Sequence, residues 1–263
     1  MDVVWLASYP KSGNTWLRFL LYCYLYGTPD DTSQVATKIP DLHRLGPEAL
    51  TNRKGNVLCK THFLPAQGHP HIAETKGFVY LIRNPRDVLL SALNYKRTLG
   101  KLDETDEQFA LRFIDNMGAP DWRQHGYGSW VEHVSYWMGA AAKLPHLILR
   151  YEQMKADPIP ALEETLRFLG ITPDPERVAS AVEASSFSSM KNMEKTERDE
   201  GKTTGFFMAQ YAGRGGNEGG MFMNQGRSDQ RLSVISEEVA ERFEARFGSV
   251  ARLLGYSLDE RDT

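Results

Sequence analysis

The pattern of apolar and polar positions along the chain predicts a sheet of buried strands flanked by amphipathic helices. Short apolar runs between turn residues are typical of parallel strands that are buried on both faces. These runs are residues 3–7, 56–60, 78–82 and 146–150. Apolar positions three or four residues apart predict helices. The helical segments are residues 15–26, 87–99, 107–116, 129–143, 159–169 and 236–254. Because strands and helices alternate, the sequence predicts an α/β fold with a mostly parallel central sheet.

Residues 188–226 form a long stretch without hydrophobic periodicity. They are polar and include a glycine-rich run at residues 213–220. A long irregular segment inside a compact domain usually has a function or is disordered. The sequence has no internal repeat and no evident domain boundary. We therefore predict a single domain over residues 1–263, with a glycine-rich lid at about residues 188–226.

The composition is that of an ordinary globular protein. The chain has 263 residues, of which 41% are hydrophobic and 25% charged, so it can fill a sizeable core. Its formal net charge of −3 gives no reason to expect nucleic acid or an anionic membrane as a partner.

Cys23 and Cys59 lie in apolar segments, which favours buried thiols over a disulfide or a metal site. The start of the chain lacks the features of a secretory signal, and its longest apolar run is too short for a membrane span. These features favour a cytoplasmic protein.

The segment YPKSGNTW joins the first predicted strand to the first predicted helix. The N–H groups at a helix N-terminus are unpaired and the helix dipole is positive there, so such a turn binds anions. Lys11 adds a full charge, and Gly13 lets a phosphate approach the backbone closely. Ser12, Asn14 and Thr15 add short hydrogen-bond donors. The sequence therefore predicts a phosphate-binding turn.

Trp16, at the start of the helix, offers a planar surface on which a nucleotide base can stack. The alternative is an ordinary strand-to-helix connection in which Lys11 is solvated and Trp16 lies in the core. This turn lacks the Gly-Lys-Ser/Thr order of the Walker A motif. ATP with magnesium is therefore not the expected ligand.

A second candidate anion site follows the third predicted strand. Arg83 ends this strand, and Ser91 lies about two turns into the next helix. An arginine at the carboxyl end of a central strand points into the ligand crevice of an open α/β sheet. It can hold a phosphate by a forked contact, with Ser91 as a hydroxyl donor. The alternative is that Arg83 pairs with Asp87 at the surface.

These segments together resemble the sulfotransferases that use 3′-phosphoadenosine 5′-phosphosulfate (PAPS). YPKSGNTW is similar to the family's 5′-phosphosulfate loop, and RNPRDVLLS, residues 83–91, is similar to its 3′-phosphate motif. KTH, residues 60–62, matches the position of its catalytic base. Weaker similarities lie at residues 127–137, 149–158 and 185–187. The resemblance implies that Tyr151 contacts the adenine and that Ser186 is a further nucleotide contact.

The resemblance implies transfer of a sulfonate from PAPS to a hydroxyl of a small-molecule acceptor, with release of 3′-phosphoadenosine 5′-phosphate (PAP). His62 is the expected general base, because the intrinsic pKa of histidine lies near operating pH. Lys11 would stabilise the leaving oxygen. Lys60, two residues before His62, would lie on the same strand face and contact the sulfonate. The alternative for His62 is a core histidine that only makes hydrogen bonds.

No metal is expected at this site. His69 and His71 are the only close pair of histidines, and no cysteine or carboxylate ligands accompany them.

The family pattern is altered near the C-terminus. The family carries Arg-Lys-Gly there, with the basic pair over the 3′-phosphate, whereas this chain has Asn224 and Gln225 before Gly226. Gly226 is kept, and Arg227 or Arg231 would supply the missing charge. The alternative is that Arg227 is a solvated loop residue.

Aromatic side chains near the predicted site favour an apolar or aromatic alcohol as the acceptor. They are Phe63, Trp122, Tyr127, Phe206, Phe207 and Tyr211. The alternative is that several of them belong to the core. Two other functions remain open: a small-molecule kinase that uses ATP and magnesium, and a protein that binds the nucleotide without catalysis. The oligomeric state also remains open.

Overall fold

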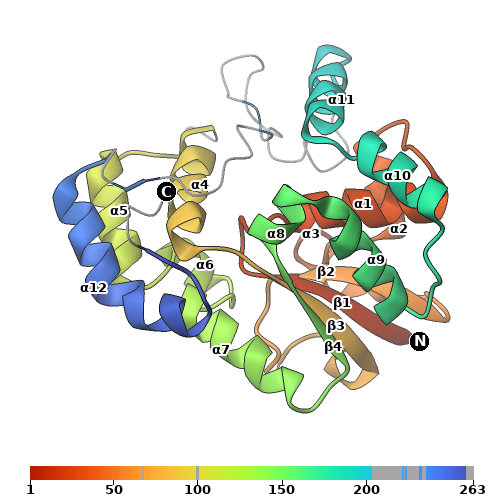
Figure 1. Cartoon of the computed structure of the whole chain (residues 1–263), viewed down its shortest axis with the longest axis horizontal. Helices are drawn as coiled ribbons and strands as arrows, with labels where there is room; N and C mark the ends of the chain where they lie inside the picture. The colour runs from red at the N-terminus through yellow and green to blue at the C-terminus, as the bar shows by residue number, and fades with distance from the viewer. Residues whose placement is uncertain are drawn as a thin grey trace.

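A parallel sheet of four strands lies at the centre of the fold (Figure 1). The computed structural model describes residues 1–66, 68–98, 101–202, 221, 223, 231–232 and 235–258. The strands are β1 (Asp2–Ser8), β2 (Asn56–Thr61), β3 (Thr75–Ile82) and β4 (His146–Arg150). Their order is β2-β1-β3-β4, and each neighbouring pair is parallel. The predicted α/β fold with a parallel sheet is confirmed.

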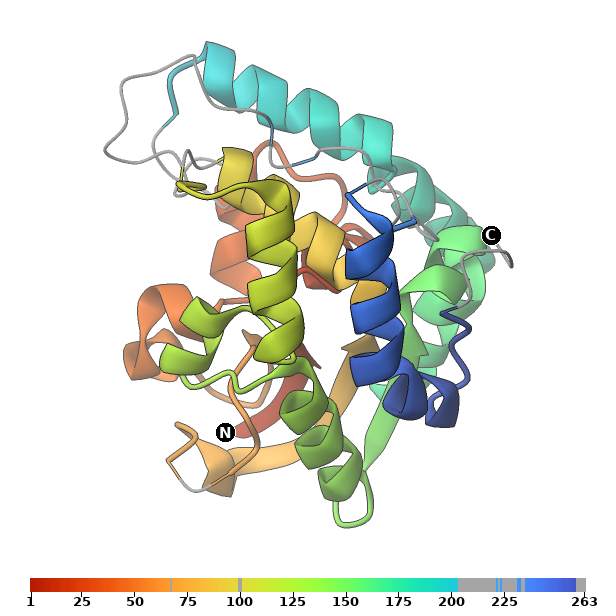
Figure 2. The same ribbon diagram turned by 90° about the vertical axis from the view of Figure 1, so that its left-hand side faces the viewer.

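Helices cover both faces of the sheet, because the strands bury side chains on both faces. In β1, Trp5 and Leu6 are fully buried but belong to different apolar clusters, since successive side chains of a strand point to opposite faces. The cluster of Leu6 includes α1 (Asn14–Tyr26), α9 (Pro158–Phe168) and α10 (Pro175–Ala184). The cluster of Trp5 includes α4 (Pro85–Thr98), α5 (Asp106–Asp115), α7 (Trp130–Ala141) and α12 (Glu237–Leu253). Figures 1 and 2 show these two groups of helices on opposite sides of the sheet.

Local sequence signals set the ends of the predicted helices. Ser129 and the glutamate three residues later form a capping box at the start of α7, and Thr105 does the same for α5. Gly27 follows the end of α1 with a φ of 90°, and Pro85 is the first residue of α4. Each predicted helix is present, with ends that shift by a few residues.

The structure also contains helices that the hydrophobic pattern does not predict. They are α2 (Thr32–Lys38), α3 (Leu42–Leu45), η1 (Pro47–Leu50), η2 (Ile72–Glu74), α6 (Pro120–Gln124), α8 (Tyr151–Ala156) and α10. Except for α10 they have seven residues or fewer, too short to display a helical period. In α10 only Val178 and Ala181 are buried, so its apolar face is too narrow to give a signal.

The prediction of irregular structure from residue 188 onward is wrong for residues 188–199. Helix α11 (Phe187–Asp199) occupies this region, with Ser186 as its N-cap. Its buried residues are Met190, Glu194 and Glu197. Because two of these are carboxylates, the buried face does not show in the pattern of hydrophobic residues. The rest of the predicted lid, apart from residues 200–202, 221 and 223, lies outside the described residues.

Candidate active site

The predicted phosphate-binding turn connects β1 to α1 and has an unusual backbone. Lys11 and Gly13 both have positive φ values, 69° and 94°. A Cβ atom at position 13 would lie 2.5 Å from Cδ2 of Tyr151, so both the backbone conformation and the packing require glycine. Gly13 is the N-cap of α1, and no side chain caps this helix end. The first N–H groups of α1 are therefore available to an anion.

Two cations from distant parts of the sequence meet at this turn. Arg83 is buried at the end of β3, and its Nη1 donates to the carbonyl of Lys11 at 2.8 Å. Lys11 is half-buried, and its Nζ lies 4.3 Å from the centre of the Tyr95 ring. Burial, and then the charges of Arg83 and Lys60, lower the pKa of Lys11 to about 7. Lys11 and Arg83 thus bring two cationic groups to this turn, which favours an anionic ligand.

Arg83 does not belong to an exposed surface pair. Arg83 and Asp87 are both buried, so the alternative of a solvated ion pair between them is wrong. The guanidinium of Arg83 stacks over the ring of Tyr151, with 4.1 Å between its Cζ and the ring centre. The ring of Trp16 meets the same tyrosine edge-on, at 6.2 Å between centroids. An aromatic and cationic cluster therefore adjoins the turn.

The short polar side chains of the turn differ in their roles. Asn14 donates through Nδ2 to the carbonyl of Leu6 at 2.9 Å and to Oγ of Ser8 at 3.1 Å, so it ties α1 to β1. The Oγ of Ser12 is buried and has no hydrogen-bond partner among the described residues. A buried hydroxyl without a partner costs free energy, which a bound anion at this turn would recover. Thr15 is half-buried at the start of α1.

Other predicted contacts lie farther from the turn or outside the described residues. Ser91 is half-buried on α4. Ser186 accepts a hydrogen bond from the backbone N–H of Ser189 at 3.2 Å, so its hydroxyl caps α11. Arg231 is exposed. The replaced basic pair and the two residues after it lie outside the described residues; they are Asn224, Gln225, Gly226 and Arg227.

His62 lies just beyond the end of β2, beside the carboxyl end of β1. Its Nδ1 is 2.5 Å from the carbonyl oxygen of Ser8. A carbonyl only accepts hydrogen bonds, so Nδ1 carries the proton and Nε2 keeps its lone pair. Burial, and then the charge of Lys60 and the ring of His43, lower the pKa of His62 well below its ordinary value. His62 is therefore neutral near pH 7, with Nε2 able to accept a proton.

Other histidines hold the backbone of His62 on both sides. The N–H of His62 donates to Nε2 of His43, and its carbonyl accepts from Nε2 of His133 at 3.1 Å. The rings of His43 and His62 stack at 5.2 Å. Sequence reasoning missed His43, because nothing in its local pattern indicates a contact with a residue 19 positions away.

Lys60 makes an ion pair that the sequence did not predict. Its Nζ lies 2.6 Å from Oδ2 of Asp41, and the two side chains are 13% and 6% exposed. Burial alone would raise the pKa of Asp41, but Lys60 and Arg18 lower it far below its ordinary range. Lys60 is thus bound to a carboxylate at the sheet edge.

Replacing Asp41 with asparagine is expected to lower the free energy of unfolding by about 3 kcal/mol, because it leaves the charge of Lys60 mostly buried without its counter-ion. Urea unfolding measures this change. Asp115→Asn is the matched control, since Asp115 pairs with Arg242 at the surface and should cost less than about 1 kcal/mol. Equal effects of the two substitutions would contradict a special role for the Asp41–Lys60 pair.

The predicted aromatic wall is partly present beside His62. The rings of His43, Phe63 and Tyr127 lie 4.2–5.7 Å apart, centre to centre, and the ring of Tyr127 is 5.7 Å from that of His62. Trp122 is buried against Tyr9, so it belongs to the core, as the alternative interpretation held. Predicted wall residues Phe206, Phe207 and Tyr211 lie outside the described residues.

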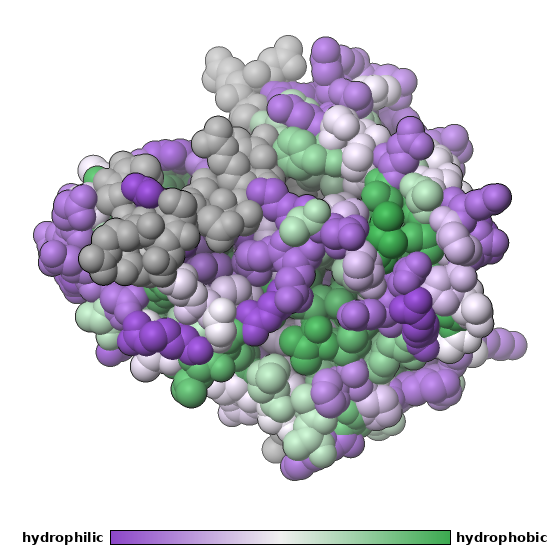
Figure 3. Space-filling view, viewed as in Figure 1, coloured by the Kyte–Doolittle hydropathy of each residue, from purple (hydrophilic) through white to green (hydrophobic). Residues whose placement is uncertain are grey.

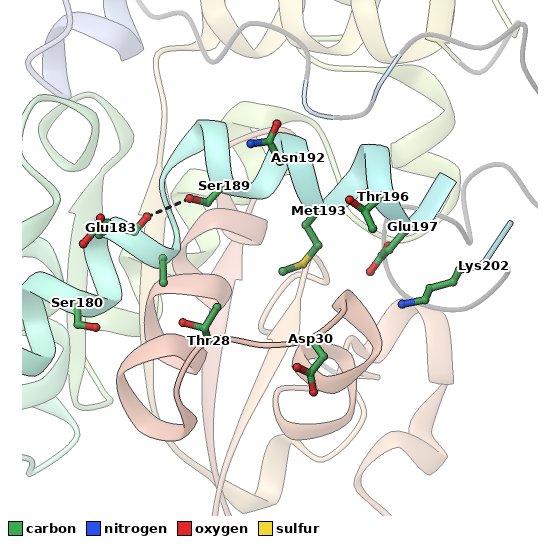
Figure 4. A pocket seen from close by; sticks show the side chains of 11 residues that line it. Thr28, Asp30, Ser180, Glu183, Ser189, Asn192, Met193, Thr196, Glu197 and Lys202 are labelled. Carbon is green, nitrogen blue, oxygen red and sulfur yellow. Dashed lines mark hydrogen bonds between the residues drawn. The ribbon is translucent and has the colours of Figure 1, made fainter. Parts of the chain in front are cut away.

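An open cavity of about 480 Å³ lies away from this site, between the end of α1 and helices α10 and α11 (Figure 4). Thr28 and Asp30 line one side, and Glu183, Asn192 and Thr196 line the other. None of its lining residues comes from the turn after β1 or from the surroundings of His62. This cavity is therefore not the candidate active site.

The part of the chain that the structure describes contains no group of three or more His, Cys, Asp or Glu side chains that could hold a metal ion. None of the helices in this part is long and apolar enough to cross a membrane. On the face shown in Figure 3, hydrophobic residues occur in small groups between hydrophilic ones.

Known proteins match this chain over most of its length. The family model described as "Sulfotransferase domain" matches residues 1–255. Human sulfotransferase 2A1 is 32% identical over 202 residues, 72% of this chain and 66% of that protein. Mouse sulfotransferase 4A1 is 29% identical over 191 residues, 68% of this chain and 64% of that protein. The matched region thus spans slightly less than two thirds of these curated relatives.

A solved structure agrees in fold. Mouse sulfotransferase SULT7A1 complexed with PAP superposes with a TM-score of 0.68 at 24% identity, covering 97% of this chain and 89% of that chain.

Proposed function

Because the chain belongs to the sulfotransferase domain family, we propose that it is a PAPS-dependent sulfotransferase that acts on a hydroxyl of a small molecule. The observation that carries the proposal is the meeting of Lys11, Arg83 and His62 at the carboxyl ends of β1, β3 and β2. Ligands of open α/β sheets bind at this edge. Cations and a neutral histidine are the groups that sulfonate transfer requires.

The turn after β1 would hold the donor nucleotide. The N-terminus of α1, Lys11, Ser12 and Gly13 would bind the 5′-phosphosulfate. The uncapped helix end supports this, as does the buried hydroxyl of Ser12, which has no hydrogen-bond partner among the described residues. Arg83 would hold the 3′-phosphate, with Ser91 as a second donor. The remaining contacts proposed for the nucleotide are Asn14, Thr15, Trp16, Tyr151, Ser186, Gly226 and Arg227.

In the proposed reaction His62 is the general base. Its Nε2 takes the proton of the acceptor hydroxyl, whose oxygen forms a new bond to sulfur. The bond from sulfur to the bridging phosphate oxygen breaks, and PAP leaves with that electron pair. Lys11 stabilises the charge on the leaving oxygen. Catalysis rests on in-line positioning and charge stabilisation, as in phosphoryl transfer.

Lys60 is proposed to contact the transferred sulfonate only after its ion pair with Asp41 loosens. In the structure the ammonium is held by that carboxylate. A bound phosphosulfate adds negative charge next to Lys60 and competes with Asp41 for it. Lys60 is thus a weaker candidate for contact with the sulfonate than Lys11.

The acceptor proposed here is an aromatic alcohol. His43, Phe63 and Tyr127 form an aromatic group beside His62, and flat rings pack well against such groups.

A thermal-shift titration with PAP tests the donor class. PAP at about a hundred times its dissociation constant should add roughly 2.7 kcal/mol of stability, whereas AMP, which lacks the 3′-phosphate, should add less. Activity should survive EDTA, because no step uses a metal. Stabilisation by ATP with magnesium but not by PAP would overturn the proposal in favour of a kinase.

A further inference from the structure

His43 lies on a segment that runs along the free edge of the sheet. β2 is the edge strand, and its Lys60 N–H donates to the carbonyl of Pro40 at 2.8 Å. Asp41 continues this contact as an isolated parallel bridge with Lys60. The chain then turns into α3, where Oδ1 of Asp41 accepts from the N–H of His43 at 3.0 Å. Asp41 therefore anchors His43 through one carboxylate oxygen and Lys60 through the other.

The side chain of His43 replaces a strand partner where β2 ends. The N–H of His62 finds its hydrogen-bond acceptor on a side chain rather than on a backbone carbonyl. Nε2 of His43 accepts this N–H, and its ring stacks on the imidazole of His62 at 5.2 Å. On the other side, His62 is fixed through Nδ1 by Ser8 and through its carbonyl by His133. His43 thus makes both a backbone and a ring contact with His62.

We propose that His43 is a positioning residue, which holds the backbone and ring of His62 so that Nε2 faces the acceptor hydroxyl. This inference rests on the proposed role of His62 as general base. If Nε2 of His43 does not accept this hydrogen bond, the N–H of His62 is left unpaired, and His62 can rotate at the end of β2. A displacement of about 1 Å in a reacting group costs up to roughly a hundredfold in rate.

Two substitutions separate the hydrogen bond from the ring. In His43→Gln the side-chain amide oxygen reaches about as far as Nε2 and accepts the N–H of His62, but cannot take a proton. In His43→Phe the ring remains and the acceptor is lost. We expect His43→Phe to lower kcat by about tenfold to a hundredfold with an unchanged KM for PAPS, and His43→Gln to recover most of this loss.

Controls make the result specific to the active site. His125→Phe alters an exposed histidine and should leave kcat unchanged. PAP-dependent thermal shifts should be the same in all these variants, which excludes a general loss of structure. If His43→Phe keeps native kcat, or if it loses PAP binding together with kcat, His43 does not position the base.

The role of His62 is measured in parallel with His62→Asn. Native turnover in His62→Asn would overturn the proposed function itself. An inactive His62→Asn together with a fully active His43→Phe would overturn only the present inference. If His43→Gln is as inactive as His62→Asn, the hydrogen bond to the N–H of His62 does not sustain turnover, and positioning through this bond is wrong.

Discussion

Replacing His62 with alanine is expected to lower turnover by about 10²–10⁴-fold while PAP still binds. The substitution removes Nε2, the only proton acceptor proposed for the acceptor hydroxyl, and general bases contribute rate factors of this size. The sites proposed for the phosphates lie on other elements, α1 and the end of β3, so nucleotide affinity should not change. Initial rates at saturating PAPS, with a phenol as acceptor, measure the effect.

His62→Asn is the matched variant for this experiment. Its side-chain N–H₂ lies where Nδ1 lies in histidine and can still donate to the carbonyl of Ser8. It therefore keeps the local structure and loses only the base. Turnover within threefold or so of the native rate in both variants would show that His62 is a core histidine, the alternative that the sequence leaves open.

The sequence predicts those parts of the site that are encoded by neighbouring residues. Lys11, Ser12 and Gly13 occupy one short turn, and the structure confirms that they precede a helix N-terminus without a side-chain cap. The strands are equally local, since Val3 to Ala7 are all buried and apolar. The order of the strands depends on contacts across the folded sheet, and the sequence analysis makes no prediction of it. The burial of Arg83 agrees with its predicted position at the end of a central strand.

The missed parts of the site depend on contacts between distant segments. Asp41 pairs with Lys60 and His43 pairs with His62, in each case 19 residues apart. Strand periodicity places Lys60 on a face but does not show which carboxylate will meet it. In α11, Glu194 is fully buried and accepts from the N–H of Met223. A polar contact of this kind has no hydrophobic period, so the helix was predicted as irregular chain.

PAP affinity is expected to fall as the pH rises above about 7, by up to tenfold per pH unit. Burial, and then Arg83 and Lys60, lower the pKa of Lys11 to about 7 in the free protein. A bound 5′-phosphate favours the charged ammonium and raises this pKa. Below pH 7 Lys11 is protonated in both the free and the PAP-bound protein, so its contribution to PAP affinity does not change with pH. Above pH 7 binding must take up a proton, and each further unit weakens it until the raised pKa of the complex is reached.

Substitutions at Lys11 identify the group that takes up this proton. Lys11→Arg keeps its charge at all these pH values and should flatten the dependence. Lys11→Met should flatten it too, but with affinity at pH 6 weaker by roughly 1.5–3 kcal/mol, the value of a charged hydrogen bond. Lys76→Met, at an exposed lysine, serves as the control and should behave as native. Isothermal titration calorimetry in two buffers of different ionisation enthalpy measures how many protons the protein takes up when PAP binds. If PAP affinity in Lys11→Met still falls with pH as steeply as in the native protein, another group takes up the proton, and Lys11 does not belong to the anion site.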